Sequence, residues 1–335
     1  MLSESKQRLK IKYYLKNNKA LDDSIIEPTI NRFYKRLYGD RYDIYDIIPN
    51  NKISEEEDNI HTLSHGLEGV SENAIDDYDK NIVKTFSKIE RNGLYTEDGY
   101  EYTKYNVFTT TGRPANSNKG INYAALNKDD GTRAKYISRF ENGKLVEFDY
   151  DAYHLRLIAD LIGMEQPEGS FHRYLGKLYF DSDSLTKEQY DESKKISFQI
   201  LYGGIPKEFR RIDYFNKTAN YISELWDIYN SKGYIETPIL KRKLYKKNLD
   251  NMNPQKLFNY FIQAYETEMN SSALKNILNL LEDYSSKMIL YVYDAFLFDI
   301  DPSEKSLIKE IQKLMVFPSK AKIGRDYHNM RSLDL

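Results

Sequence analysis

An acidic residue at the end of an apolar run constrains the fold more than any other feature of the sequence. Residues 145–156 read LVEFDYDAYHLR, in which apolar residues lead into Asp149 and a helix-like run follows. A second aspartate, Asp294, interrupts the apolar, β-rich segment 288–300, MILYVYDAFLFDI. A carboxylate in such a setting costs free energy unless a hydrogen bond or a metal compensates it. We therefore predict that the fold brings Asp149 and Asp294 together on adjacent strands.

Such a pair of aspartates has two interpretations. On adjacent strands they can bind two divalent cations about 3.5–4 Å apart, the arrangement that serves in-line displacement at phosphorus. Alternatively, each is an ordinary strand-end residue that forms a turn or faces solvent. The spacing of the pair does not separate these alternatives, so the motifs between the two aspartates have to decide.

The composition narrows the class of protein. The 335 residues include no cysteine, which excludes disulfides, thiolate zinc sites and cysteine nucleophiles. No apolar run approaches the roughly 20 residues of a membrane span, so we expect a soluble, intracellular protein without a membrane partner. The net charge of −2 argues weakly against nucleic acid, but the distribution of charge matters more. Three basic clusters are either solvated faces or phosphate contacts: residues 6–19, 207–211 and 241–247.

The clearest predicted helix covers residues 186–204. Thr186 and Gln189 form a capping box at its start, and two glycines followed by a proline end it. Four residues recur at every fourth position and share one face of this helix: Tyr190, Lys194, Phe198 and Tyr202. An aromatic stripe at helical spacing is normally part of a core. A lysine within the stripe instead suits a charged phosphate beside a stacked base or sugar.

Three further segments carry polar groups suited to phosphates or bases. Residues 109–116 read TTTGRPAN, where a glycine beside Arg113 lets backbone and guanidinium approach a phosphate together, unless the segment is an ordinary turn. Residues 233–247 predict a hairpin with a basic second strand. Residues 254–284 predict a long helix, on which the side-chain amides of Asn259 and Gln263 share one face. These amides either contact base or sugar edges or are solvated.

Taken in order, these segments resemble the motifs of family A DNA polymerases over about residues 103–335. TTTGRPAN resembles the family's TGR motif, and FDYDAYHLRLIA resembles its first carboxylate motif. The finger-helix motif K-x3-F-x3-YG is matched at 194–203, and GYIET at 233–237 resembles GYVET. VYDA at 292–295 stands where the family has VHDE. The sequence TTTGRPAN is more similar to that of phage-encoded members of the family.

The resemblance implies an α+β fold of the right-hand type, with an antiparallel palm sheet, helical fingers and a reduced helical thumb. The implied divisions are a helical, thumb-like region at 1–102, palm at 103–165, fingers at 166–250 and a second part of the palm at 251–335. The implied activity is that of a DNA-directed DNA polymerase. Such an enzyme extends a primer 3′ end with deoxynucleoside triphosphates on a template.

The resemblance also implies roles for particular residues. Asp149 and Asp294 would hold two Mg²⁺ ions, or Mn²⁺, with the backbone carbonyl of Tyr150, and Lys194 would be the third catalytic side chain. The nucleotide site would comprise Tyr150, His154, Tyr190, Phe198 and Tyr202. Primer–template DNA would be contacted by Arg113, Asn259, Gln263, Lys241, Arg242 and Lys243.

Several positions depart from the family pattern. The family's glutamate that excludes ribonucleotides is His154 here, and an arginine that touches the triphosphate is Tyr190. A second arginine is Gln255, and VHDE has become VYDA, with Ala295 in place of the glutamate. These departures leave two alternatives open: a polymerase-like DNA-binding or replication-accessory subunit with weakened catalysis, and a ribonucleotide-tolerant or RNA-making polymerase.

The segment before the TGR motif is short. Residues 1–102 leave room for a small thumb but not for the proofreading exonuclease that the family often carries upstream. We therefore expect no exonuclease on this chain, and a separate exonuclease or processivity subunit as a partner. The other expected partners are primer–template DNA and deoxynucleoside triphosphates. The expected location is the cytoplasm, that of a bacterial host if the chain is phage-encoded.

Overall fold

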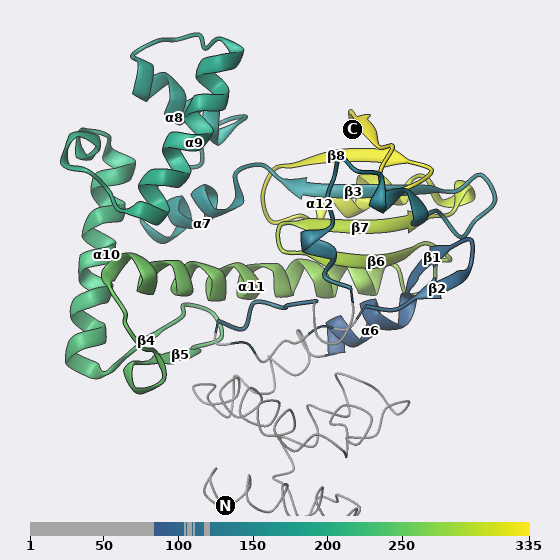
Figure 1. The fold of residues 1–335 in the computed structure, drawn as a ribbon, viewed down its shortest axis with the longest axis horizontal. Coiled ribbons are helices and arrows are strands. Elements are labelled where there is room, and N and C mark those ends of the chain that lie inside the picture. The colour runs from purple at the N-terminus through teal and green to yellow at the C-terminus, as the bar shows by residue number, and fades with distance from the viewer. Residues whose placement is uncertain (1–83, 104, 106–108, 110, 117–120) are drawn as a thin grey trace, which may run out of the picture.

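The computed structural model describes residues 84–335 apart from 104, 106–108, 110 and 117–120. The basic cluster at 6–19 and most of the predicted thumb-like region lie outside the described residues. Helices combine with antiparallel sheets, which confirms the predicted α+β class. In Figure 1 the largest sheet lies on one side and a group of helices on the other, with one long helix running beneath both. No helix of the described residues is long and apolar enough to cross a membrane.

The largest sheet has five antiparallel strands in the spatial order β6-β7-β3-β8-β9. These are β3 (Lys144–Tyr150), β6 (Lys287–Val292), β7 (Ala295–Ile300), β8 (Ser319–Gly324) and β9 (Arg331–Leu333). Two short hairpins lie outside it: β1 (Leu94–Thr96) with β2 (Gly99–Glu101), and β4 (Tyr234–Glu236) with β5 (Lys243–Tyr245). Because β3 lies between β7 and β8, its end is next to the β6–β7 turn.

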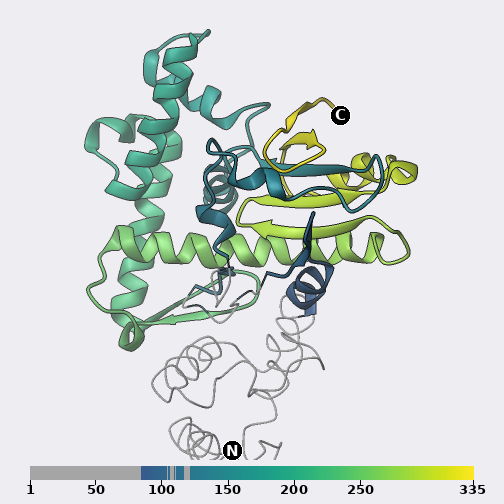
Figure 2. The ribbon, with the colours of Figure 1, turned by 45° about the vertical axis from the view of Figure 1, so that its right-hand side comes forward.

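The helices come mainly from the segment between β3 and β6. They are α6 (Lys84–Asn92), α7 (Tyr153–Leu161), α8 (Phe171–Phe180), α9 (Lys187–Gly203), α10 (Asp213–Lys232), α11 (Pro254–Leu280) and α12 (Leu307–Lys313). Short 3₁₀ helices occupy Tyr123–Ala125, Thr132–Lys135, Lys207–Arg211, Lys246–Asn248 and Pro302–Glu304. Figure 2 shows α8, α9 and α10 standing together away from the sheet, with α11 leading from them to the strands.

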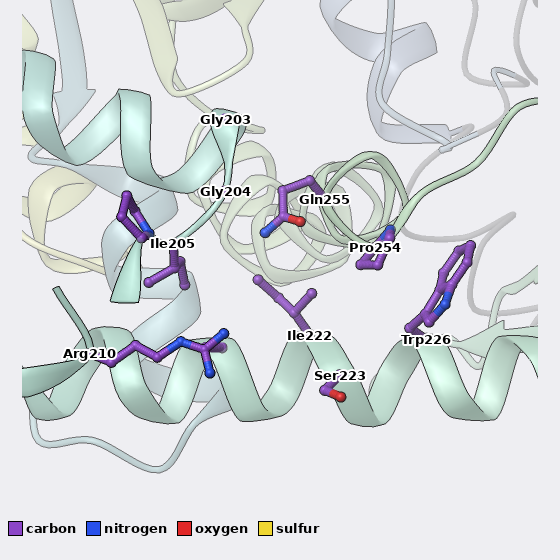
Figure 3. Close-up of a pocket in the computed structure, with 11 residues that line it drawn as sticks. Gly203, Gly204, Ile205, Arg210, Ile222, Ser223, Trp226, Pro254 and Gln255 are labelled. Atoms are coloured by element: carbon purple, nitrogen blue, oxygen red, sulfur yellow. The ribbon is translucent and has the colours of Figure 1, made fainter. Parts of the chain in front are cut away.

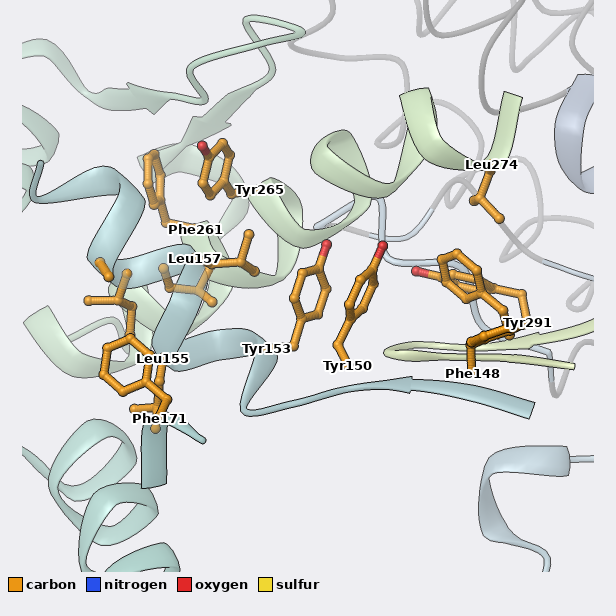
Figure 4. Close-up of a cluster of buried hydrophobic side chains, with 14 of the residues drawn as sticks. Phe148, Tyr150, Tyr153, Leu155, Leu157, Phe171, Phe261, Tyr265, Leu274 and Tyr291 are labelled. Carbon is orange, nitrogen blue, oxygen red and sulfur yellow. The ribbon is translucent and has the colours of Figure 1, made fainter. Parts of the chain in front are cut away.

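The two faces of the five-stranded sheet are buried in different cores. On β3, Val146, Phe148 and Tyr150 belong to the large core shared with the helices, whereas Leu145 belongs to a smaller core on the other face. This follows from the alternation of side chains along a strand. Figure 4 shows Phe148 and Tyr150 among core side chains that include Leu274 of α11. Asp149 therefore points to the face of the sheet that is away from α11.

Most predicted elements are present. The capping box of Thr186 and Gln189 opens α9, and the 233–247 segment forms the β4–β5 hairpin. The helix predicted at 254–284 ends earlier, at Leu280. In the described part of the predicted helical 1–102 region, α6 is followed by the β1–β2 hairpin, because Gly93 ends α6 in a left-handed conformation (φ 61°).

Candidate active site

The end of β3 and the β6–β7 turn bring Asp149 and Asp294 together, as the sequence predicted. Asp149 pairs with Ala295 across the two strands, and Asp294 immediately precedes Ala295. The backbone N–H of Tyr150 donates a hydrogen bond of 3.1 Å to the carbonyl of Asp294. The two acidic side chains are thus fixed by the hydrogen bonding of a sheet rather than by a flexible loop.

Two non-glycine residues beside the aspartates have left-handed backbones. Ala152 (φ 55°) precedes α7, and Tyr293 (φ 57°) lies in the β6–β7 turn. Such conformations are unfavourable for residues with a Cβ and cluster at functional sites. The guanidinium of Arg113 lies 3.6 Å from the centre of the Tyr293 ring, which stabilises this turn by a cation–π contact.

A cavity of about 370 Å³ opens in front of the two aspartates. Every residue that the resemblance assigned to catalysis or nucleotide binding lines it, together with Arg113. Tyr150 contributes through its backbone, since its ring is buried and stacks on Tyr153 at 4.4 Å between ring centres. The lining therefore combines carboxylates, cations and aromatic rings.

Helix α9 supplies the exposed side of this cavity. Phe198 and Tyr202 stack one turn apart, with ring centres 6.0 Å apart and an angle of 6°, and each is 43% exposed. Lys194 lies 3.6 Å from Asp191 and 4.2 Å from the centre of the Tyr190 ring. The predicted stripe is therefore not a core stripe, because its aromatic faces remain available for stacking.

A fully buried carboxylate, that of Glu266 on α11, organises one wall of the cavity. Its Oε1 accepts a hydrogen bond of 3.1 Å from Nε of Arg113, and its Oε2 lies 2.8 Å from Nε2 of His154. Nδ1 of His154 lies 2.5 Å from the hydroxyl of Tyr202. This network joins the TGR segment, α7, α9 and α11. Glu266 was not predicted from the sequence, although it lies three residues after Gln263.

The cavity is also lined by residues that were not predicted from the sequence, among them Asp151, His172 and Lys320. Burial lowers the pKa of His172 to about 4, which keeps its imidazole neutral at pH 7. Its buried Nδ1 has no hydrogen-bond partner in the part of the chain that the structure describes. That nitrogen is therefore available to a group bound in the cavity.

Burial and like charge shift the pKa of both aspartates upwards. Burial first, and then the charge of Asp294, raises the pKa of Asp149 to about 6. Burial and the charge of Glu266 raise the pKa of Asp294. A bound cation would relieve this cost, since it neutralises two carboxylates that otherwise repel each other. The pair, with nearby backbone carbonyl oxygens, therefore fits divalent cations that prefer oxygen ligands.

The raised pKa predicts that Asp149→Asn stabilises the metal-free protein in a pH-dependent way. Below the unfolded value near 3.8, Asp149 is neutral in both states, so the wild type and the variant have similar stability. As the pH rises from about 3.8 to about 6, Asp149 ionises in the unfolded chain before it ionises in the folded protein, so the wild type loses stability until the folded carboxyl is also charged. At pH 7.5 we expect the variant to be more stable by about 1–2 kcal/mol. Denaturant unfolding with a chelator tests this, and a pH-independent difference contradicts it.

The residues predicted to contact DNA lie outside the cavity, except Arg113. Asn259 and Gln263 are half-buried on α11, where Oε1 of Gln263 accepts a hydrogen bond of 3.4 Å from Oγ1 of Thr111. Lys241 is exposed at the β4–β5 turn, and Nζ of Lys243 lies 4.8 Å from the centre of the Tyr234 ring. These four side chains lie on α11 and on the β4–β5 hairpin, and none of them lines the cavity.

The prediction that Arg242 contacts DNA is wrong, because this residue is buried and only 4% exposed. Arg242 immediately precedes β5, between the exposed Lys241 and the half-buried Lys243. Burial raises the pKa of Glu268, and the charge of Arg242 offsets part of this rise. Arg242 also packs against Gly112, where an added Cβ would lie 2.9 Å from Nη2 of Arg242. Arg242 therefore supports the turn of the TGR segment and has no free surface for DNA.

A second cavity, of about 510 Å³, lies at the end of α9 (Figure 3). It is lined by Gly203, Gly204 and Ile205, by Arg210 and Trp226, and by Gln255 at the start of α11. No acidic residue lines it, so it offers no carboxylate to hold a cation or to act as a base. The smaller cavity at Asp149 and Asp294 is therefore the candidate active site.

Comparisons with known proteins agree with this geometry. The chain is 24% identical over 266 residues to DNA polymerase I of Synechocystis sp. and 23% identical over 239 residues to that of Caldicellulosiruptor bescii. These alignments cover 64% and 61% of this chain but 27% and 28% of the relatives, so the chain spans little more than a quarter of their length. No protein-family model matches the chain.

A solved polymerase structure is similar to a larger part of this chain. The POL domain of Pol1 from M. smegmatis, in complex with DNA primer-template and dNTP, matches with a TM-score of 0.57 at 16% identity. The match covers 97% of this chain and 65% of that one. The fold is therefore that of a DNA polymerase domain. With relatives named DNA polymerase I, the chain is a relative of the family A DNA polymerases, as its motifs predicted.

Proposed function

We propose that the chain is a template-directed DNA polymerase that extends a primer 3′ end with deoxynucleoside triphosphates. The observation that carries this proposal is the single cavity in which Asp149 and Asp294 face Lys194 and an exposed pair of stacked aromatic rings. Paired carboxylates suit metal-assisted attack at phosphorus, a lysine suits phosphate charge, and flat rings suit a base. The three chemistries that nucleotide transfer needs are thus present in one place.

The carboxylates serve to hold cations. Asp149 and Asp294, with the backbone carbonyl of Tyr150, would hold two Mg²⁺ ions, or Mn²⁺, which when bound lower the pKa of the primer 3′-hydroxyl and neutralise the triphosphate. Lys194 neutralises charge on the phosphates and donates a proton to the leaving pyrophosphate. Its position on α9 lets it act from the side of the cavity that carries the aromatic rings.

The aromatic residues and the surrounding polar groups position the substrates. Phe198 packs on the incoming nucleotide, and Tyr202 stacks at the template position until α9 closes. Tyr190 and His154 complete the nucleotide site. Primer–template DNA is contacted by Arg113, Asn259, Gln263, Lys241 and Lys243. In this assignment the five-stranded sheet with α11 is the palm, α8 to α10 are the fingers, and residues 1–102 belong to the thumb.

The test of this function is primer extension on a defined template with Mg²⁺. A polymerase-like subunit with weakened catalysis would bind primer–template DNA without extending it, so DNA binding is measured in parallel. A separate processivity subunit would raise extension when added, whereas a separate exonuclease would remove nucleotides from the primer 3′ end. The proposed location is the cytoplasm, where bacterial and phage DNA is copied.

We expect weak discrimination against ribonucleotides. The imidazole of His154 stands where a carboxylate excludes the 2′-hydroxyl in the family that this chain resembles, and both ring nitrogens are engaged by Glu266 and Tyr202. Single-turnover incorporation of matched deoxy- and ribonucleotides measures this selectivity. A preference for deoxynucleotides of several thousandfold would contradict the prediction.

A double substitution provides the matched comparison for sugar selectivity. His154→Glu alone would place a second carboxylate beside buried Glu266, so it is combined with Glu266→Gln to keep one negative charge. We expect this double variant to discriminate more strongly than the wild type. Equal selectivity in the two proteins would show that residue 154 does not act on the sugar.

A further inference from the structure

Lys320 lies in the candidate active site although it comes from the C-terminal part of the chain. It is on β8, directly opposite Asp149 of β3. Residues directly opposite in an antiparallel pair point to the same face of the sheet, so Lys320 and Asp149 share the face that is away from α11. The side chain of Lys320 is 64% exposed and lines the cavity together with Lys194.

Asp151 holds the ammonium group of Lys320 in this place. Nζ of Lys320 lies 2.6 Å from Oδ1 of Asp151. The other carboxylate oxygen of Asp151 accepts hydrogen bonds from the backbone N–H of Phe171 at 3.2 Å and from Nη2 of Arg156 at 3.4 Å. Because Asp151 is buried and fixed from β3, α7 and the start of α8, it is a rigid anchor for the flexible lysine.

Among the cationic side chains that line the cavity, two lysines are available to bind an anionic ligand. The cationic side chains that line it are Arg113, Lys194 and Lys320. Arg113 is engaged by Glu266 and by the Tyr293 ring. Lys194 on α9 and Lys320 on β8 are more exposed, at 40% and 64%. Asp151, the partner of Lys320, lines the cavity, whereas Asp191, the partner of Lys194, is exposed on α9. A triphosphate entering between α9 and the sheet therefore meets an ammonium group from each element.

We infer that Lys320 binds the phosphate groups of the incoming nucleotide together with Lys194, and that Asp151 is the positioning residue that presents it. This inference rests on the proposed function and adds a residue from the last part of the sheet to the nucleotide site. An ammonium group gives no fixed geometry, so Lys320 can turn from Asp151 towards a phosphate oxygen without moving β8. Burial lowers the pKa of Lys320, but the ion pair with Asp151 outweighs it and raises the pKa, so the group stays charged.

The alternative is that Lys320 only neutralises buried Asp151. The two roles predict different effects of Asp151→Asn on the stability and on the KM for nucleotide. If neutralisation is the whole role, Lys320→Ala lowers the stability, and adding Asp151→Asn restores it, while the KM for nucleotide stays near the wild-type value throughout. If Lys320 binds phosphate, the KM rises in Lys320→Ala, and Asp151→Asn does not restore it.

The experiment measures kcat and KM for the matched deoxynucleotide in primer extension by the full chain. We expect Lys320→Ala to raise the KM about tenfold with a smaller change in kcat, and Lys320→Arg to retain most of the affinity. The matched control is Lys309→Ala, an exposed lysine on α12 that does not line the cavity. An unchanged KM in Lys320→Ala, or full recovery in the double variant with Asp151→Asn, would overturn the inference.

A second measurement separates failure of this inference from failure of the proposed function. Inorganic tripolyphosphate is titrated calorimetrically into the wild type, Lys320→Ala and Lys309→Ala in the presence of Mg²⁺. We expect about tenfold weaker binding for Lys320→Ala alone. If the wild type extends no primer but this difference appears, the polymerase assignment fails and the phosphate site stands. Equal binding by all three proteins rejects the phosphate site, whatever the extension assay gives.

Discussion

Asp149→Ala is expected to reduce primer extension by about a thousandfold or more and to leave binding of primer–template DNA nearly unchanged. The reason is the geometry at the end of β3, where Asp149 and Asp294 are the two acidic side chains fixed next to each other by sheet hydrogen bonds. Removing one carboxylate halves the charge available to a cation. Single-turnover extension and a fluorescence-anisotropy binding assay measure the two quantities.

An exposed aspartate provides the control for this variant. Asp283 follows α11 on the surface and does not line the cavity, so Asp283→Ala should extend primers like the wild type. Asp294→Ala should reproduce the loss seen with Asp149→Ala. Near-normal extension by either cavity variant would reject the assignment of the carboxylate pair.

Glu266→Ala is expected to have the second-largest effect, on stability and on activity together. The carboxylate is fully buried and bonds to Arg113 and His154, so its loss leaves a guanidinium and an imidazole without their acceptor. Breaking a buried pair in this way costs about 3 kcal/mol. The loss also frees His154 and, through it, Tyr202, so we expect nucleotide incorporation to fall more than about tenfold. Denaturant unfolding and single-nucleotide incorporation measure the two effects.

Two further variants serve as controls for Glu266→Ala. Glu266→Gln keeps a hydrogen-bonding side chain at the same place and should cost less than about 1.5 kcal/mol. Glu282→Ala breaks a surface ion pair with Lys88 and should have little effect on stability or activity. If Glu266→Ala unfolds like the wild type and incorporates nucleotides normally, the buried network does not organise the site.

The local elements were predictable where a short-range signal fixes them. The capping box of Thr186 and Gln189 set the start of α9, and the glycines after Tyr202 set its end. The neighbouring positions of Asp149 and Asp294 followed from apolar, strand-like runs around each aspartate, because such runs pair within a sheet. The Tyr190–Tyr202 stripe was ambiguous from sequence, and only the exposed rings of Phe198 and Tyr202 decide that it faces a cavity.

The contacts that depend on distant pairing were not predictable. Glu266 lies within a long helix that is buried on most sides, and its partners are 112 and 153 positions away. Lys320 acquires its place only through the β3–β8 register. Arg242 looked like part of a basic surface, but it is buried just before β5, where its charge acts on Glu268. A buried charge and an exposed one look alike in a sequence until the partner is known.

Template-directed polymerisation is tested by incubating the full chain with Mg²⁺, a primed template and one deoxynucleotide at a time. We expect that only the nucleotide complementary to the first template base is added, and that addition stops at the next template base. If the protein binds the primed template but adds no nucleotide, it is not a polymerase. Addition that ignores the template base, or that persists in Asp149→Ala, would be equally inconsistent with a template-directed polymerase whose metal ligand is Asp149.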